Sequence, residues 1–140
     1  MLSNCCEGYY NLVRRDDSDV NWVLLKYESN TKIRAESIGT GGLSEVVPHL
    51  TEKDTAFIYM RFQTGDVESK RAKFVLFSWC GSRAPIMRKA KMSVHKADVK
   101  QIFASSALEV HATEPSDLDE ASVRASLIRA GGANYNGQNQ

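Results

Sequence analysis

Alternating polar and apolar positions, rich in β-branched and aromatic residues, predict five strands in this chain. The predicted strands cover residues 20–28, 31–39, 55–63, 73–80 and 107–113. The stretches TAFIYMRFQ and KFVLFSWC are the most strand-like of the five. A short SN turn separates the first two strands, which predicts that they pair as a hairpin.

Apolar residues spaced three or four apart predict four helices. A first helix is expected within LSNCCEGYYNLVRRD, a short one over LSEVVPHL and a long one over residues 88–106. The long helix carries one apolar stripe, formed by Met92, Val99, Ile102 and Phe103.

The last helix has the clearest boundaries. Ser116 stands three residues before Asp119, as in a capping box, and Gly131 and Gly132 follow the helical pattern. The apolar stripe expected on this helix consists of Leu118, Ala121, Ala125 and Ile128.

Some of these strands are joined by tight turns and others by helices, which is typical of a mixed sheet. We therefore predict an α/β fold in which helices cover both faces of the sheet. No internal repeat or second domain is evident, so we expect one domain over residues 1–132 and a flexible polar tail over residues 133–140.

Composition and charge narrow the functional classes. The 140-residue chain has 18 basic and 17 acidic side chains, a formal net charge of +1, which argues against binding nucleic acid through bulk charge. It has no apolar run long enough to span a membrane. Its three cysteines are an odd number and include the neighbours Cys5 and Cys6, so we do not expect a disulfide framework. We therefore expect a cytoplasmic location.

The residues with catalytic or ligating potential do not form a recognisable site. The stretch GTGGLSE lacks the Lys-Ser/Thr ending of a phosphate-binding loop, and His49, His95 and His111 are too scattered for metal-ligand spacing. Cys80 follows a buried strand, where an inert thiol is expected. We predict neither an enzyme nor a bound metal or cofactor.

Two basic clusters indicate a protein interface. The segment SKRAK contains Lys70, Arg71 and Lys73 immediately before a strand, where alternation places Arg71 and Lys73 on one face. The segment RKAKM contributes a second set at the start of the long helix, formed by Arg88, Lys89, Lys91 and Met92. A charge run is usually a solvated surface, but cations beside a methionine that we expect to be exposed favour docking against an acidic partner.

Four stretches also resemble coactosin-like proteins, a branch of the actin-depolymerising-factor homology (ADF/cofilin) family. They are YYNLVRRDDSDVNWVLLKYE, RFQTGDVESKRAKFVLFSWCG, MRKAK and AGGANY. The resemblance implies a mixed five- or six-stranded sheet between two pairs of helices. It also implies a monomeric, cytoskeletal protein that binds the sides of actin filaments without strong severing, with contacts at Lys73 and at Arg129, where the family usually has Lys.

The same resemblance leaves alternatives open. The actin-facing surface of the family centres on the start of the long helix. In this region the stretch KMSVHK resembles cofilins more than coactosins. Binding of monomeric actin, or remodelling of filaments, therefore stays as an alternative function. Phosphoinositide head groups are a second alternative for the basic residues. Ser3 is interpreted as a helix cap or as a regulatory serine, and cap statistics favour the cap. We expect all the named cations to converge on one patch.

Overall fold

The computed structural model describes residues 6–15, 17–29, 32–64, 71–104 and 106–132. Ser3, Lys70 and the tail expected at 133–140 lie outside this part of the chain. The strands are β1 (Trp22–Ser29), β2 (Lys32–Gly39), β3 (Thr55–Thr64), β4 (Arg71–Cys80) and β5 (Leu108–Ala112). The helices are α1 (Cys6–Arg14), α2 (Leu43–Val46), α3 (Ile86–Ile102) and α4 (Glu120–Gly132), with 3-10 turns η1 (Val47–His49) and η2 (Pro115–Asp117).

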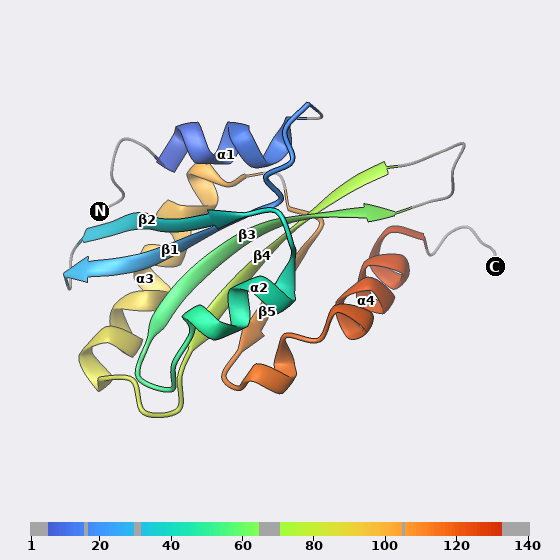
Figure 1. Cartoon of the computed structure of the whole chain (residues 1–140). Helices are drawn as coiled ribbons and strands as arrows, with labels where there is room; N and C mark the ends of the chain where they lie inside the picture. Colours follow the sequence, from blue (N-terminus) through green and yellow to red (C-terminus); the bar gives the residue numbers. More distant parts are fainter. Residues whose placement is uncertain (1–5, 16, 30–31, 65–70, 105, 133–140) are drawn as a thin grey trace.

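The strands form one mixed sheet in the order β2-β1-β3-β4-β5 (Figure 1). The pairs β1–β2, β1–β3 and β3–β4 are antiparallel, whereas β5 is parallel to β4. A parallel neighbour needs a crossover connection, and α3 supplies it between β4 and β5. The mixed five-stranded sheet is confirmed.

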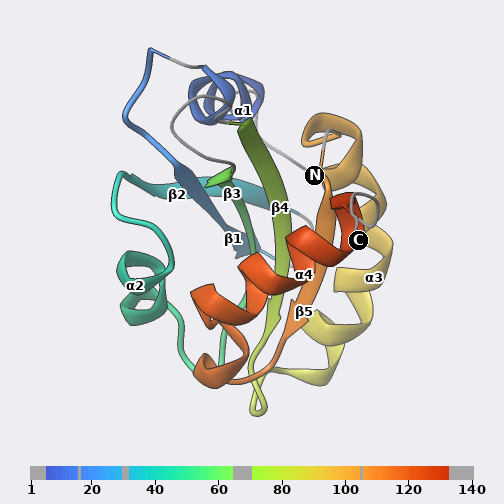
Figure 2. The same cartoon turned by 90° about the vertical axis from the view of Figure 1, so that its right-hand side faces the viewer.

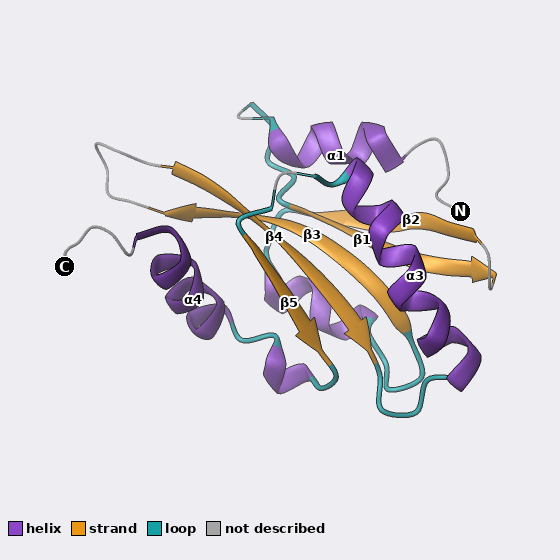
Figure 3. Ribbon diagram, turned by 180° about the vertical axis from the view of Figure 1, so that it is seen from behind, coloured by secondary structure: helices purple, strands orange, loops and turns teal. Residues whose placement is uncertain are grey.

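Each face of the sheet is covered by one pair of helices, so the predicted sandwich is also confirmed. Helices α1 and α3 lie on one face, and α2 and α4 lie on the other (Figures 2 and 3). Along β3 the side chains alternate between the two cores: Phe57 and Tyr59 pack under α1 and α3, while Ile58 and Met60 pack under α2 and α4. No helix in the described part of the chain is long and apolar enough to cross a membrane.

Helix α1 is held on the sheet by an arginine among aromatic rings. The Arg14 guanidinium carbon lies 4.4 Å from the centroid of the Phe74 ring. Arg14 Nη1 also donates a hydrogen bond of 3.3 Å to the hydroxyl of Tyr59. Tyr59 is fully buried, and its burial raises the pKa of the phenol to about 12, so the hydroxyl stays neutral.

The expected capping box at Ser116 and Asp119 is wrong. The capping box instead joins Glu114 and Asp117 around η2. Asp119 caps α4 alone, because its carboxylate accepts a 3.0 Å hydrogen bond from the backbone amide of Ser122.

The expected apolar stripe of α4 is wrong as well, apart from Leu118. Val123 and Leu127 are each 3% exposed and pack against the sheet. Ala121 and Ala125 are exposed, and Ile128 is 68% exposed. Helix α4 is therefore rotated about its axis relative to the predicted orientation.

Candidate functional site

Lys73 is placed by strand alternation in β4. Its neighbours Ala72 and Phe74 pack on the α1/α3 face of the sheet, so Lys73 projects to the α2/α4 face. Its partner across the β3–β4 ladder is Phe62, which packs in the core on that same face. Lys73 itself is half-buried.

Helix α4 lies over this end of the sheet. Arg124 Nη1 donates a 2.7 Å hydrogen bond to the carbonyl of Gln63, and the Arg124 guanidinium carbon lies 5.3 Å from the centroid of the Phe62 ring. Arg129 follows five residues later, about 7.5 Å further along the helix axis. The last turns of α4 lie beside the ends of β3 and β4 that residues 65–70 connect (Figures 1 and 3). Lys73 and Arg129 therefore share one face of the sheet.

We call Lys73, Ile128 and Arg129 the hairpin–α4 surface. Within the described residues, no carboxylate lies within ion-pair distance of Lys73 or Arg129; Arg129 Nη2 instead donates a 3.0 Å hydrogen bond to Ser126 Oγ. Arg124, by contrast, pairs with Glu120 at 2.9 Å. Neither charge of this surface is therefore compensated by a carboxylate of the described chain. Arg71 begins β4, but its side chain is not described.

The second basic group lies at the start of α3. The Arg88 guanidinium carbon lies 5.1 Å from the centroid of the Tyr27 ring, whose hydroxyl is 2.9 Å from Nδ1 of His95. Burial raises the pKa of Tyr27 to about 12, so Arg88 packs against a neutral phenol. Lys89 is exposed and Lys91 is half-buried, and no described carboxylate pairs with either.

The expectation that Met92 is exposed is wrong. Met92 is 6% exposed and packs in the core beneath α3. Two exposed apolar residues, Ile86 and Met87, at 84% and 60%, lie instead in the first turn of the helix. Pro85 directly before them is a sequence feature that marks this helix start. We call Ile86, Met87, Arg88, Lys89 and Lys91 the α3-start surface.

The two surfaces do not converge, so the prediction of one patch is wrong. Lys89 lines the same groove as Cys80, the last residue of β4, whereas Lys73 lies seven residues earlier in that strand. Seven residues of extended strand span about 23 Å. The surfaces also lie on opposite faces of the sheet, because α3 covers one face and α4 the other.

Comparison with known proteins places this chain and its fold in one family. Residues 1–128 match the cofilin/tropomyosin-type actin-binding protein family. The chain belongs to this family. Coactosin of Dictyostelium discoideum is 40% identical over 129 residues, which cover 91% of this chain and 88% of that protein. The human coactosin-like protein is 35% identical over 135 residues, 96% of this chain and 94% of that protein.

Solved structures of coactosins share this cofilin-family fold. A crystal structure of the human coactosin-like protein superposes with a TM-score of 0.85 at 31% identity, covering 91% of this chain and 97% of that one. Coactosin from Entamoeba histolytica gives a TM-score of 0.85 at 35% identity, covering 92% and 94%. Mouse coactosin, described as an actin filament binding protein, gives 0.78 at 34% identity, covering 97% and 94%.

Proposed function

We propose that this protein binds the sides of actin filaments through the hairpin–α4 surface and modulates cytoskeletal dynamics without strong severing. Membership of an actin-binding family supports this function, as does the likeness to mouse coactosin, described as an actin filament binding protein. The observation that carries the proposal is the position of Lys73 and Arg129. These two cations lie on one face of the sheet without a described carboxylate partner.

The burial of Lys73 sets its expected contribution. Lys73 is half-buried, so a partner covering it would desolvate its charge. Lys70, which lies outside the described residues, is proposed as a rim residue of the interface. Rim charges mainly raise the association rate, and truncating one member of a desolvated pair costs about 2–5 kcal/mol. We expect Lys73→Ala to weaken filament binding at least about tenfold, which corresponds to about 1.4 kcal/mol.

Co-sedimentation with actin filaments, titrated at two salt concentrations, tests this assignment. Lys53→Ala is the matched control, because Lys53 is exposed, has no described ion pair and lies in the turn before β3, at the other end of the β3–β4 ladder from Lys73. We expect Lys73→Ala and Arg129→Ala to lose binding and Lys53→Ala to keep it. Wild-type binding by Lys73→Ala would show that the contact lies elsewhere.

Binding of monomeric actin through the α3-start surface is the second candidate, with filament remodelling as its consequence. The observation favouring it is the exposure of Ile86 and Met87 beside Lys89 and Lys91, since apolar groups within a ring of cations are typical of a docking surface. Met87→Gln with Lys89→Gln should then abolish monomer binding and leave filament co-sedimentation unchanged. A monomer-binding fluorescence titration beside the pelleting assay separates the two functions.

Phosphoinositide binding is the weaker alternative for the hairpin–α4 surface. Each cation near an anionic membrane contributes only about 1 kcal/mol, and few cations gather at this surface. We expect no flotation with phosphoinositide-containing liposomes, and flotation that Lys73→Ala abolishes would support the alternative.

We also infer a cytoplasmic location on the actin cytoskeleton, which fluorescence microscopy with a filament stain tests.

A further inference from the structure

The end of β3 and the start of β4 extend beyond the other strands of the sheet (Figure 1). The ladder between β1 and β3 ends at Met60, and one further backbone hydrogen bond follows at Arg61. From Phe62 to Thr64, the described residues of β3 pair with β4 alone, and Lys73 lies opposite Phe62. We call residues 62–64 and 71–73 the ribbon. Two strands without a third are only marginally stable and twist more than a wide sheet, so the position of the ribbon depends on contacts from outside it.

Arg124 of α4 supplies such contacts. Its Nη1 donates a 2.7 Å hydrogen bond to the backbone carbonyl of Gln63, and its guanidinium carbon lies 5.3 Å from the centroid of the Phe62 ring. Its Nε donates a 2.9 Å hydrogen bond to Glu120, one turn earlier in α4. One guanidinium therefore connects the backbone of the ribbon, an aromatic side chain of the ribbon and the helix above it.

Helix α4 is held on the sheet without help from Arg124. Val123 and Leu127 are each 3% exposed and pack in the core beneath the helix. Loss of the Arg124 contacts would therefore free the ribbon and leave the helix in place. Since Lys73 belongs to the ribbon and Arg129 to the helix, Arg124 controls how these two cations lie relative to each other.

We propose that Arg124 is a positioning residue for filament binding, which holds Lys73 and Arg129 in one arrangement rather than contacting actin itself. This inference rests on the function proposed for the hairpin–α4 surface. The charge of Arg124 is compensated by Glu120 at 2.9 Å, so it is less suited than the other two to attract an acidic partner. Lysine cannot replace it, because an ammonium group is a point charge whereas the planar guanidinium donates in several fixed directions.

The charge-conserving variant Arg124→Lys separates positioning from direct contact. In filament co-sedimentation at two salt concentrations, we expect it to bind about fivefold more weakly, the factor for one lost hydrogen bond. Its affinity should also depend less on salt, as expected for Lys73→Ala, because Lys73 no longer reaches its partner although the net charge is unchanged. A direct contact by Arg124 would keep the salt dependence, and so would a merely structural role that lowers the folded fraction.

Arg129→Lys is the matched control on the same helix. The described side-chain hydrogen bond of Arg129 goes to Ser126 within α4, so a lysine keeps the charge that this position provides. We expect Arg129→Lys to bind filaments within about twofold of the wild type, with the same salt dependence.

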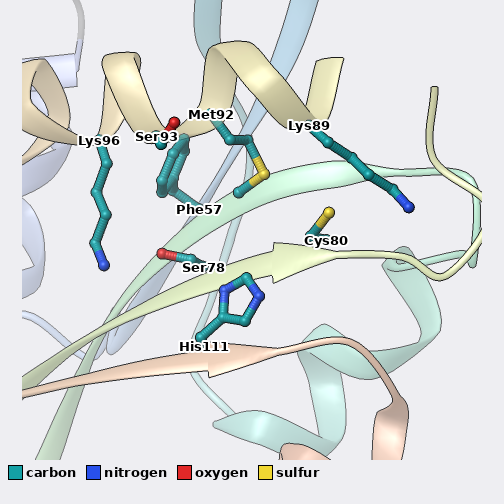
Figure 4. Close-up of a pocket in the computed structure, with 8 residues that line it drawn as sticks. All are labelled: Phe57, Ser78, Cys80, Lys89, Met92, Ser93, Lys96 and His111. Atoms are coloured by element: carbon teal, nitrogen blue, oxygen red, sulfur yellow. The ribbon is translucent and has the colours of Figure 1, made fainter. Parts of the chain in front are cut away.

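Amide hydrogen exchange of the ¹⁵N-labelled full-length chain tests the positioning role without actin. Arg124→Lys should raise the exchange rates of the protected amides in the ribbon about fivefold, and Arg129→Lys should leave them unchanged. Lys96→Gln controls for general destabilisation. Lys96 points from α3 towards the other face of the sheet and pairs with Glu109 of β5 at 3.3 Å, so this variant weakens a helix–sheet contact far from the ribbon (Figure 4). It should leave ribbon exchange and filament binding within about twofold of the wild type.

The outcomes distinguish this inference from the proposed function. Wild-type ribbon exchange in Arg124→Lys would overturn the positioning role, as would equal effects of Arg124→Lys and Lys96→Gln on that exchange. If Lys73→Ala loses filament binding while Arg124→Lys keeps it, the positioning role alone is wrong. If Lys73→Ala binds like the wild type, the proposed function is wrong and the positioning role falls with it.

Discussion

Two neighbouring residues of α4, Leu127 and Ile128, should respond in opposite ways to the same truncation. Leu127 is 3% exposed and belongs to the core beneath α4, whereas Ile128 is 68% exposed. The apolar stripe predicted from sequence would have placed Ile128 in the core. Replacing each residue in turn by alanine therefore tests the orientation of the helix directly.

The structure sets the size of both effects. Leu127→Ala removes three buried carbon atoms, worth about 0.8 kcal/mol each, and leaves a cavity that adds to this loss. We expect it to lower the free energy of unfolding by about 3 kcal/mol. Ile128→Ala removes exposed carbons, and alanine is the better helix former, so its effect should stay within about 0.5 kcal/mol.

Urea unfolding followed by circular dichroism measures both variants, and thermal unfolding provides a check. For a domain of this size, a loss of 3 kcal/mol corresponds to a fall in Tm of about 10 °C. Equal destabilisation by the two substitutions, or a larger effect at Ile128, would refute the orientation of α4 described above. Because Ile128 precedes Arg129 on the hairpin–α4 surface, co-sedimentation of the Ile128→Ala protein also tests whether that surface contacts filaments.

Three further outcomes are expected. Gly42 has a φ of 86° just before α2, so Gly42→Ala should lower the free energy of unfolding, measured in urea, by about 1–2 kcal/mol. Gly8 lies in α1 with open space around it, so Gly8→Ala should stabilise the protein by up to about 1 kcal/mol. Tyr59→Phe removes the hydrogen bond from Arg14 and should cost about 1 kcal/mol in the same assay. Hydrogen bonds from the backbone amides of Thr113 and Glu114 lower the pKa of Asp117 in the folded protein. The carboxylate therefore stabilises the fold above its unfolded pKa, and this stabilisation is lost as the pH falls through the lower folded pKa. Between pH 7 and about pH 3, the Tm of Asp117→Asn should fall less than the Tm of the wild type.

The strands could be predicted from sequence because their residues are apolar on both faces, as expected for a sheet with helices packed on both sides. In β3 the sequence TAFIYM is apolar on both faces, and the structure buries Phe57 in one core and Ile58 in the other. The stripe of α3 was equally clear, since Val99 and Phe103 lie four residues apart and both are fully buried.

The orientation of the helix surfaces was harder to predict. In α4, Ala121 and Ala125 fit a buried or an exposed face equally well, because alanine has little side chain to bury. Counting them as buried led to the wrong prediction that Ile128 lies on the buried face. In α3, Met87 and Met92 are chemically identical, and only the packing of the helix on the sheet shows which one is exposed.

The arrangement of the basic residues could be predicted only in part. Alternation in β4 correctly places Lys73 opposite Phe74, but it does not say which helix covers which face. The separation of the α3-start surface from Lys73 depends on the crossover of α3 between β4 and β5, which is a property of the whole topology.

The edge of the sheet at β2 bears on self-association of the protein. An edge strand offers unpaired amides and carbonyls on which a second copy could add its own strand and start an aggregate. Strand β2 carries Lys32, Arg34 and Glu36 on one side, and Glu28 of β1 pairs with both of the basic residues. Strand addition would crowd these charges against those of the incoming chain, so the charged edge protects the sheet from self-association.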